Sequence, residues 1–299
     1  MRVAIIGRTE VLYDTAILLK DKGFEIPLIV TSKEAPEYLR KAADFKELAH
    51  QFGSEFIYTP KINSPDVIEK IKSVGHIDIA VSINYSGVIS ENVIDIFSKG
   101  ILNVHGGDLP KYRGNACQAW AIINGENRVG LCVHKMIGGE LDSGNIILKE
   151  YLPIDINTKV GKVLDWIRLV TPDMIYRSVR LLKENENYVF EVQSKKVEDA
   201  LRCYPRTQDD NKINWTLSNV EVLRLINASS EPYSGAFAEF EGSPIIIWDA
   251  ELYNDDEIYS ATPGQVAEIN SEQGYVIVIT GKGKLKILVM DCLEEALLM

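Results

Sequence analysis

Residues 77–104 carry the pattern that decides the fold, and their sequence is IDIAVSINYSGVISENVIDIFSKGILNV. An apolar run at Ile77–Ile83 is followed by a helix start at Ser90-Glu91-Asn92 and then by a second apolar run, Gly100–Val104. Two short apolar strands separated by a helix predict parallel neighbours in a sheet that helices cover. The stretch therefore predicts one strand–helix–strand unit.

The same alternation extends toward the N-terminus. Strands are expected at Arg2–Ile6, Phe24–Val30 and Glu55–Tyr58, and helices at Thr9–Lys22, at Ala43–Gln51 and from Ser64 onward. The helix that begins near Ser64 has proline in its first turn, where the missing N–H costs nothing, and an acid near the positive end of the helix dipole. We therefore expect an α/β fold with a Rossmann-like parallel sheet and helices on both faces.

The hydrophobic period changes toward the C-terminus. Lys159–Glu186 is expected to be helical with a break or kink at Pro172, because proline lacks the backbone N–H. From Gly235 onward short apolar runs are separated by turn residues, and the expected strands are Ala236–Phe240, Pro244–Leu252, Gln265–Ile269, Tyr275–Thr280 and Leu285–Met290. This pattern predicts a smaller β-barrel-like (OB-like) C-terminal domain. The predicted division is into residues 1–204 and 205–299.

Composition excludes several classes of protein. The chain has 299 residues, of which 46% are hydrophobic and 25% charged, so disordered and collagen-like classes are excluded. No apolar run approaches the roughly 20 residues that a membrane-spanning helix needs. The four cysteines form no CxxC pair, so neither a disulfide framework nor a metal site is expected. We expect a cytoplasmic protein with reduced cysteines and no membrane partner.

Charge is divided unevenly along the chain. Residues 205–299 hold 6 Lys and Arg against 16 Asp and Glu, a net charge of −10, whereas the first 204 residues hold 26 and 27, a net charge of −1. Nucleic-acid affinity depends on basic groups that displace counterions, so the acidic part is a poor candidate for binding RNA. Its acidic run Asn254–Glu257 is expected to be a solvated loop.

Asn103 and His105 are the first candidates for chemistry. They lie two residues apart at the end of a predicted strand, so their side chains share a face, and ligands bind at the carboxyl ends of such strands. A lone N-x-H pair is more often two polar side chains that form hydrogen bonds with the backbone groups at the end of a strand. The ordered set is more specific: residues 103–114 are NVHGGDLPKYRG, and residues 141–144 are LDSG, with Asp142 37 positions after His105. On the strand expected at Gly130–Met136, between these motifs, His134 is predicted to be a core histidine, with a side chain that points into the site as the alternative.

These motifs resemble the 10-formyltetrahydrofolate-dependent formyltransferase family, which includes glycinamide-ribonucleotide, methionyl-tRNA and nucleotide-sugar N-formyltransferases. The resemblance covers nearly the whole chain, because Tyr204–Asp210, Ile213–Trp215 and Glu231–Phe237 look like the family's second domain. The sequence departs from the family pattern at one place. The segment from Met136 to Asp142 is one residue longer, which affects the expected position of Asp142.

The resemblance implies that Asn103, His105 and Asp142 form the catalytic trio. Formyl transfer to an amine requires a base, and histidine is the side chain whose pKa lies near neutrality. The Asn103 amide can donate a hydrogen bond to the oxyanion, a contribution of about 3–4 kcal/mol in comparable sites. Asp142 is expected to orient His105 and to favour its charged form.

The resemblance also implies which residues bind the formyl donor and the acceptor. The donor, N10-formyltetrahydrofolate, is expected to contact Ser82, Asn84, Tyr85, Ser86, Gly87, Leu141 and Asp142. The acceptor is expected to contact Gly106, Gly107, Lys111, Tyr112, Arg113, Gly114, Arg206 and Tyr233.

The branch that the sequence resembles most acts on UDP- or dTDP-linked 4-amino sugars, whose formylated products enter bacterial surface glycans such as lipopolysaccharide. A diphosphate acceptor needs only one or two cations, which Lys111, Arg113 or Arg206 can supply. The alternative, methionyl-tRNA, is disfavoured by the acidic C-terminal part. A non-catalytic folate-binding module is disfavoured by the intact trio. The expected partner is thus a nucleotide sugar and not a nucleic acid, and a homodimer is left open.

Overall fold

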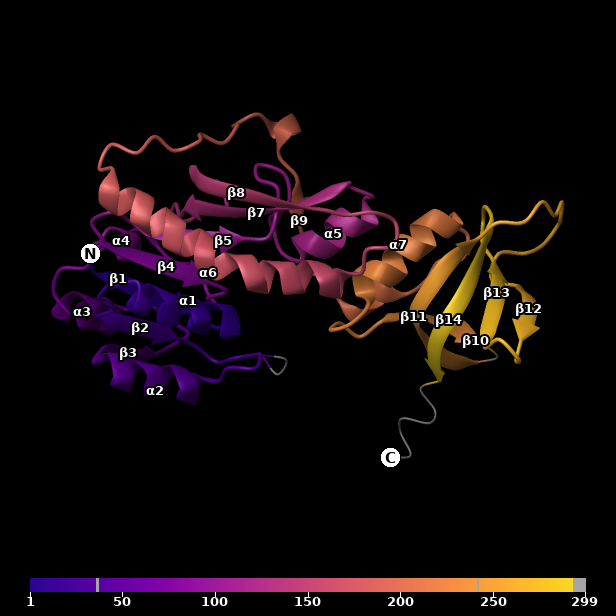
Figure 1. Cartoon of the computed structure of the whole chain (residues 1–299), viewed down its shortest axis with the longest axis horizontal. Coiled ribbons are helices and arrows are strands. Elements are labelled where there is room, and N and C mark those ends of the chain that lie inside the picture. Colours follow the sequence, from indigo (N-terminus) through magenta and orange to yellow (C-terminus); the bar gives the residue numbers. More distant parts are fainter. Residues whose placement is uncertain (36–37, 241, 293–299) are drawn as a thin grey trace. The chain divides into compact units, whose positions relative to one another are not determined.

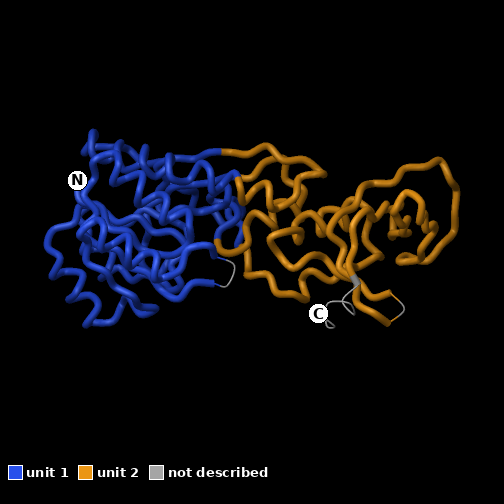
Figure 2. The backbone as a smooth tube through the Cα atoms, turned by 60° about the horizontal axis from the view of Figure 1, so that its bottom comes forward, with its two compact units in different colours: residues 1–113, 130–150, 166–202 blue, residues 114–129, 151–165, 203–299 orange. Residues whose placement is uncertain are grey.

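The computed structural model describes residues 1–35, 38–240 and 242–292. The chain divides into two compact units, coloured separately in Figure 2. Unit 1 comprises residues 1–113, 130–150 and 166–202, and unit 2 comprises residues 114–129, 151–165 and 203–299. In the described part of the chain, no helix is long and apolar enough to span a membrane.

A seven-stranded sheet dominates unit 1, with the strand order β3-β2-β1-β4-β5-β7-β8 (Figure 1). Its strands are β1 (Val3–Gly7), β2 (Leu28–Thr31), β3 (Glu55–Tyr58), β4 (Ile79–Ile83), β5 (Ile101–His105), β7 (Arg128–Lys135) and β8 (Ile146–Pro153). The first five are parallel to their neighbours, whereas β7 runs antiparallel to β5. The predicted α/β class is confirmed, and the sheet is mixed because β7, which follows helix α5 in the chain, pairs with β5 in the antiparallel direction.

Strand β1 shows why the sheet needs helices on both faces. All five of its residues are buried, and alternate side chains enter two different hydrophobic clusters. Val3 and Ile5 belong to one cluster with residues of α1, α2 and α6, while Ala4 and Ile6 belong to another with residues of α3 and α4. Burial on both faces is the expected property of a central parallel strand. The helices are α1 (Glu10–Asp21), α2 (Ala42–Phe52), α3 (Pro65–Ser73), α4 (Glu91–Ile94), α5 (Cys117–Ile123) and α6 (Val160–Glu184).

Helix α6 continues through Pro172, so of the predicted break or kink the break is wrong. Proline removes one hydrogen bond from a helix interior. The turn that follows compensates through packing, because Met174, Ile175 and Val179 are fully buried in the cluster that also contains α1.

Unit 2 contains a five-stranded antiparallel sheet with the order β10-β11-β14-β13-β12. Its strands are β10 (Ala236–Phe240), β11 (Ser243–Tyr253), β12 (Val266–Asn270), β13 (Tyr275–Ile279) and β14 (Lys284–Cys292). Helix α7 (Asn219–Ser229) packs its buried residues Val222, Leu223 and Ile226 against this sheet. A smaller β-rich C-terminal domain, as the sequence predicts, is therefore present.

The remaining elements are short. Strands β6 (Arg113–Gly114) and β9 (Arg202–Cys203) pair with each other, and 3-10 turns occupy Val197–Asp199 and Gln208–Asn211. The backbone N–H of Arg113 donates to the carbonyl of Leu201 at 2.8 Å. This pairing fixes the chain just after the first of the two sequence motifs.

Candidate active site

The pairing of β5 with β7 brings three polar side chains together. Asn103 lies opposite His134 in the antiparallel ladder, and His105 lies opposite Cys132. Because side chains two residues apart share a face of a strand, Asn103, His105 and His134 gather on the same side of the sheet. The rings of His105 and His134 meet edge to face, with centroids 6.3 Å apart.

His105 is buried between a carbonyl and a carboxylate. Its Nε2 lies 2.6 Å from the backbone oxygen of Tyr112, and its Nδ1 lies 3.5 Å from Oδ2 of Asp142. A carbonyl oxygen only accepts hydrogen bonds, so Nε2 carries a hydrogen and Nδ1 is the nitrogen that gains or loses a proton. The protonatable atom therefore faces Asp142.

Burial sets the resting charge of His105, whose exposed fraction is 7%. Desolvation lowers the pKa of His105 from its ordinary 6.5, and the nearby Asp142 carboxylate opposes this effect without cancelling it. The imidazole is therefore neutral at pH 7 and able to accept a proton. The imidazolium formed in this way is stabilised by the carboxylate beside it.

The longer loop does not keep Asp142 away from the histidines. Asp142 adopts a positive φ of 48°, which aspartate tolerates better than most residues. Its Oδ2 faces His105, and its Oδ1 lies 3.5 Å from Nε2 of His134. The structure thus places Asn103, His105 and Asp142 in one cluster, with His134 as a fourth member.

His134 fixes the amide of Asn103. Its Nδ1 donates to the carbonyl of Lys135 at 2.8 Å, so Nε2 accepts a hydrogen bond from Nδ2 of Asn103 at 3.2 Å. One N–H of that amide is therefore anchored, which orients the other. Sequence reasoning assigned His134 to the core, and it is indeed only 2% exposed, but its polar atoms belong to the cluster.

Two glycines allow the backbone to approach this cluster closely. A Cβ on Gly107 would lie 2.3 Å from the carbonyl oxygen of Tyr112 and 2.7 Å from Nε2 of His105. A Cβ on Gly144 would lie 1.8 Å from the carbonyl oxygen of Lys135, where the Asp142 loop rests on β7. Any side chain at these positions would displace one of the contacts that hold His105 or Asp142.

The loop after β4 contains most of the residues expected to bind the formyl donor. Ser82 is buried and lies opposite Asn103 in the β4–β5 ladder. The Tyr85 hydroxyl donates to the carbonyl of Thr59 at 2.7 Å, and the Ser86 hydroxyl donates to Ser32 at 2.8 Å. Asn84, Ser86 and Gly87 are exposed, as is Leu141 in the Asp142 loop.

Arg8 braces this loop, a role that sequence reasoning did not assign. Its Nε donates to the carbonyl of Asn84 at 2.8 Å, and its Nη1 donates to the carbonyl of Lys33 at 2.7 Å. One side chain after β1 therefore ties the connections that follow β2 and β4. These connections leave the carboxyl ends of strands, which is where ligands bind in open α/β sheets.

The residues expected to bind the acceptor do not all share one environment. Lys111 is exposed, Gly106 and Gly114 are half-buried, and Tyr112 is buried with its carbonyl directed to His105. The Arg113 guanidinium donates from Nη2 to Oε1 of Gln193 at 2.8 Å. Arg113 also lowers the pKa of His105 through its positive charge, which places it close to that ring.

Arg206 and Tyr233 belong to unit 2. The Arg206 guanidinium donates to the carbonyl of Ala228 at 3.1 Å, to Oδ1 of Asn211 at 2.7 Å and to Oγ of Ser229 at 3.0 Å. This network gives Arg206 a structural role within its own unit. The Tyr233 side chain is exposed.

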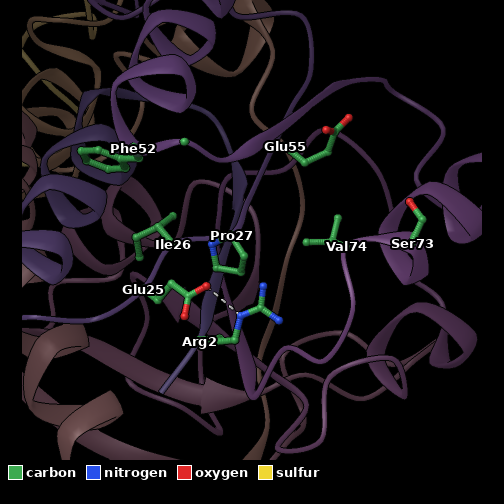
Figure 3. A pocket seen from close by; sticks show the side chains of 9 residues that line it. Arg2, Glu25, Ile26, Pro27, Phe52, Glu55, Ser73 and Val74 are labelled. Atoms are coloured by element: carbon green, nitrogen blue, oxygen red, sulfur yellow. Dashed lines mark hydrogen bonds and ion pairs between the residues drawn. The ribbon is translucent and has the colours of Figure 1, made fainter.

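A pocket elsewhere in unit 1 is shown in Figure 3. It is lined by residues at the amino ends of strands, and an ion pair between Arg2 and Glu25 crosses it, with a separation of 2.9 Å between Nε and Oε1. It contains no member of the histidine cluster. Among the described residues no set of histidine, cysteine and carboxylate side chains is arranged to hold a metal ion, and Cys117, Cys132 and Cys203 are buried thiols outside any disulfide.

Sequence comparisons assign this fold and cluster to a class. The N-terminal domain of formyl transferase matches residues 1–179, and its C-terminal domain matches residues 206–294. The chain belongs to the formyl transferase family.

A curated relative is the methionyl-tRNA formyltransferase of Ruminiclostridium cellulolyticum, which is 27% identical over 290 residues and aligns with 93% of this chain and 90% of its own length.

Solved structures share the fold at lower sequence identity. WlaRD, described as a sugar 3N-formyl transferase and solved in the presence of dTDP and 5-N-formyl-THF, superposes with a TM-score of 0.71 and 19% identity over 96% of this chain and 97% of its own. HypX from Aquifex aeolicus gives a TM-score of 0.62 and 17% identity over 97% of this chain. This chain spans 44% of the length of HypX.

Proposed function

We propose that this enzyme transfers a formyl group from N10-formyltetrahydrofolate to the amine of a nucleotide-linked 4-amino sugar, UDP- or dTDP-linked. The observation that carries the proposal is the cluster of Asn103, His105 and Asp142 at the end of β5, on a chain that belongs to the formyl transferase family. The acidic charge of residues 205–299 supports the sugar-nucleotide branch of the family over the tRNA branch.

The residues after β4 and around Asp142 suit the formyl donor. Tyr85 and Ser86 turn their hydroxyls toward Thr59 and Ser32, while the segment itself is exposed, so its backbone can bind the hydrogen-bonding edge of a pterin. When bound, the donor supplies an activated formyl carbon. Ser82, Asn84, Gly87 and Leu141 complete the proposed donor site.

His105 acts as the general base in this proposal. Because burial keeps it neutral, Nδ1 can take the proton that the amine loses as the new C–N bond forms. The imidazolium can return that proton to N10 of the donor as the bond between N10 and the formyl carbon breaks, so that tetrahydrofolate leaves as the neutral amine. The carboxylate of Asp142 then stabilises the imidazolium, and the Tyr112 carbonyl keeps the ring in place.

Asn103 stabilises the negative charge that develops on the formyl oxygen. One of its amide hydrogens is anchored on His134, so the other is held in a fixed direction before the reaction. A donor oriented in advance costs no reorganisation during the reaction, and the loss of one such donor typically costs about 3–4 kcal/mol.

The cations of residues 205–299 are largely committed to contacts within unit 2. Arg206 is hydrogen-bonded to loop atoms, Lys212 pairs with Glu239 at 2.9 Å, and Lys286 pairs with Glu251 at 3.0 Å. Lys284 is buried against Asp255 and Glu257. Four of the six cations in this acidic stretch thus have intramolecular partners, which favours a small acceptor over an RNA. Exposed Lys111, together with Arg113 and Gly106–Gly107 beside His105, is our candidate contact for the diphosphate-linked acceptor.

Methionyl-tRNA is the second candidate acceptor. The observation in its favour is the 27% identity to a methionyl-tRNA formyltransferase, which extends over both domains. Against it stands the shortage of uncommitted cations in the C-terminal stretch.

The test is a mass-spectrometric turnover assay. The purified protein and N10-formyltetrahydrofolate are mixed with a panel of UDP- and dTDP-linked 4-amino sugars and, separately, with methionyl-tRNA. We expect a gain of one formyl group on a sugar nucleotide. Formylation of the tRNA alone would overturn the proposed acceptor while leaving the proposed chemistry intact.

The matched control is His105→Ala. It should bind the donor nearly as tightly as the wild type and lose turnover, because the ring is placed as a base rather than as a binding group. An equal loss of donor binding and of turnover would contradict the role of His105.

A further inference from the structure

His105 lies between two segments of the chain, one on each side of its ring. The side chain of Gln193 is hydrogen-bonded to both segments. The Tyr112–Arg113 stretch contacts Nε2 of His105, and the Asp142 loop faces Nδ1. Gln193, in the coil that follows α6, donates from Nε2 to the carbonyls of Asp142 at 2.8 Å and Gly144 at 2.7 Å. Its Oε1 accepts from Arg113 at 2.8 Å.

Both polar atoms of the Gln193 amide have hydrogen-bond partners. It offers two N–H donors and one carbonyl acceptor, and all three have partners. The residue is only 5% exposed. Buried hydrogen bonds of this kind are costly to lose, because the partners left behind cannot turn to water.

The backbone around Gln193 is itself fixed. Two residues earlier, Glu191 exchanges hydrogen bonds with Ile146 at the start of β8, at 2.8 and 2.9 Å. The coil therefore lies alongside the end of the Asp142 loop. Gln193 thus reaches the loop from an anchored position.

The partner on the other side is also anchored. Arg113 donates its backbone N–H to Leu201, and its neighbour Tyr112 is held at a positive φ of 57°. A tyrosine rarely adopts this conformation without support from its surroundings. The link between Arg113 and Gln193 provides such support next to the carbonyl that holds His105.

We propose that Gln193 is a positioning residue that sets the separation between the Asp142 carboxylate and His105. It holds the two segments that flank His105. Its N–H groups donate to the Asp142 loop, and its carbonyl oxygen accepts from Arg113. The inference rests on the proposed role of His105 as the base.

The first readout does not depend on the acceptor. The chain has four histidines, so histidine-labelled protein gives few NMR signals, and His105 can be assigned from the spectrum of His105→Asn. The charged or titratable groups that face His105 are Asp142 from its loop, His134 from β7 and Arg113 from β6. Of these, only Asp142 raises the pKa of His105.

In Gln193→Met, which keeps the side-chain volume and loses the hydrogen bonds, the Asp142 loop is released. We expect the pKa of His105 to fall below its wild-type value. Burial lowers this pKa, and a displaced Asp142 carboxylate would raise it less than in the wild type. The matched control is Ser194→Ala, which removes a hydrogen bond to Asp199 within the same coil and should leave this pKa unchanged. An unchanged pKa in Gln193→Met, or the same shift in Ser194→Ala, would overturn the proposal.

Formyl transfer provides the second readout. Gln193→Glu retains an acceptor for Arg113 but loses both donors to the Asp142 loop. We expect kcat to fall roughly tenfold or more in Gln193→Glu as well as in Gln193→Met, because small displacements of catalytic groups carry large rate penalties. Wild-type kcat in Gln193→Glu would contradict the role of the two donors. If no acceptor in the panel is formylated, the NMR titration still decides the proposal, so its failure is distinguishable from that of the proposed function.

Discussion

His105 shows how one residue obtains its reactivity from two opposing influences. Burial favours the neutral ring, and the Asp142 carboxylate favours the charged ring, with burial the stronger of the two. A base in this balance is free to accept a proton at neutral pH and is stabilised once it has done so.

This balance predicts the acid limb of the pH profile. A base is active when unprotonated, and a lowered pKa extends the unprotonated form to lower pH. We therefore expect log kcat/KM, expressed on the concentration of unprotonated acceptor amine, to stay level from neutral pH down past 6.5, the ordinary pKa of histidine, and to fall only at lower pH. The measurement is a steady-state profile between about pH 5 and 8, with the titration of the free acceptor measured separately. An acid limb that stays centred above 6.5 after this correction would show that the carboxylate, rather than burial, dominates the pKa of His105.

At the residue scale, the sequence was enough to select Asn103, His105 and Asp142. It was not enough to select the residues that hold them in place, His134 and Gln193. Asn103, His105 and Asp142 stand in a recognisable order, and the cluster contains all three; their catalytic roles stay predictions until variants are measured. His134 joins them through the antiparallel register of β5 and β7, which no short motif encodes. Gln193 is 51 residues from Asp142 and 80 from Arg113, and nothing in its local sequence marks it.

At the scale of elements, strands with clear apolar runs were predicted well, and ambiguous segments were missed. Glu55–Tyr58 and Ala236–Phe240 have the predicted bounds. β8 was missed because its sequence, IILKEYLP, mixes charged with apolar residues at an edge of the sheet. Helix α7 was missed although Ser218 and Glu221 form a capping box at its start, a signal that the sequence does contain.

The loop Asn254–Glu257 is exposed and lies outside any helix or strand, as predicted. Its ion pairs were not predicted: Asp255 contacts Nζ of Lys284 at 2.6 Å, and Glu257 pairs with the same lysine. The Lys284 side chain, at the start of β14, is only 4% exposed. These carboxylates hold the pKa of Lys284 above its usual range, so the lysine stays charged at every physiological pH.

Removal of this buried cation should free the loop. In Lys284→Met we expect backbone amides of the loop to exchange with deuterium about tenfold faster, because the loop loses its anchor while the sheet keeps an apolar side chain in place. Lys282→Met is the matched control, since Lys282 is exposed and lies two residues away. Equal exchange in both variants would mean that other contacts hold the loop.

At the scale of the whole molecule, the uneven distribution of charge is the basis of the proposed acceptor. Four cations of the acidic stretch 205–299 are committed within unit 2, and that stretch carries a net charge of −10. Within that stretch few cations remain for an RNA, whereas the first 204 residues hold 26 Lys and Arg.

This predicts a weak response to salt. Between about 50 and 200 mM salt, kcat/KM should change only several-fold for a nucleotide sugar, because one or two phosphate contacts release few counterions. The measurement is initial rate at subsaturating acceptor across that range, with donor binding measured in parallel as the control. A loss of three or more orders of magnitude would indicate an RNA acceptor.

The path of the chain between the two units also limits how this protein could be recombined. Residues 114–129 and 151–165 belong to unit 2, although unit 1 both precedes and follows them. A cut after residue 204 would leave these stretches with unit 1, including helix α5, whose Cys117, Ala119 and Ile122 are buried. Exchange of the C-terminal domain at a single junction, by evolution or by a protein engineer, would therefore leave two segments of the same compact unit behind.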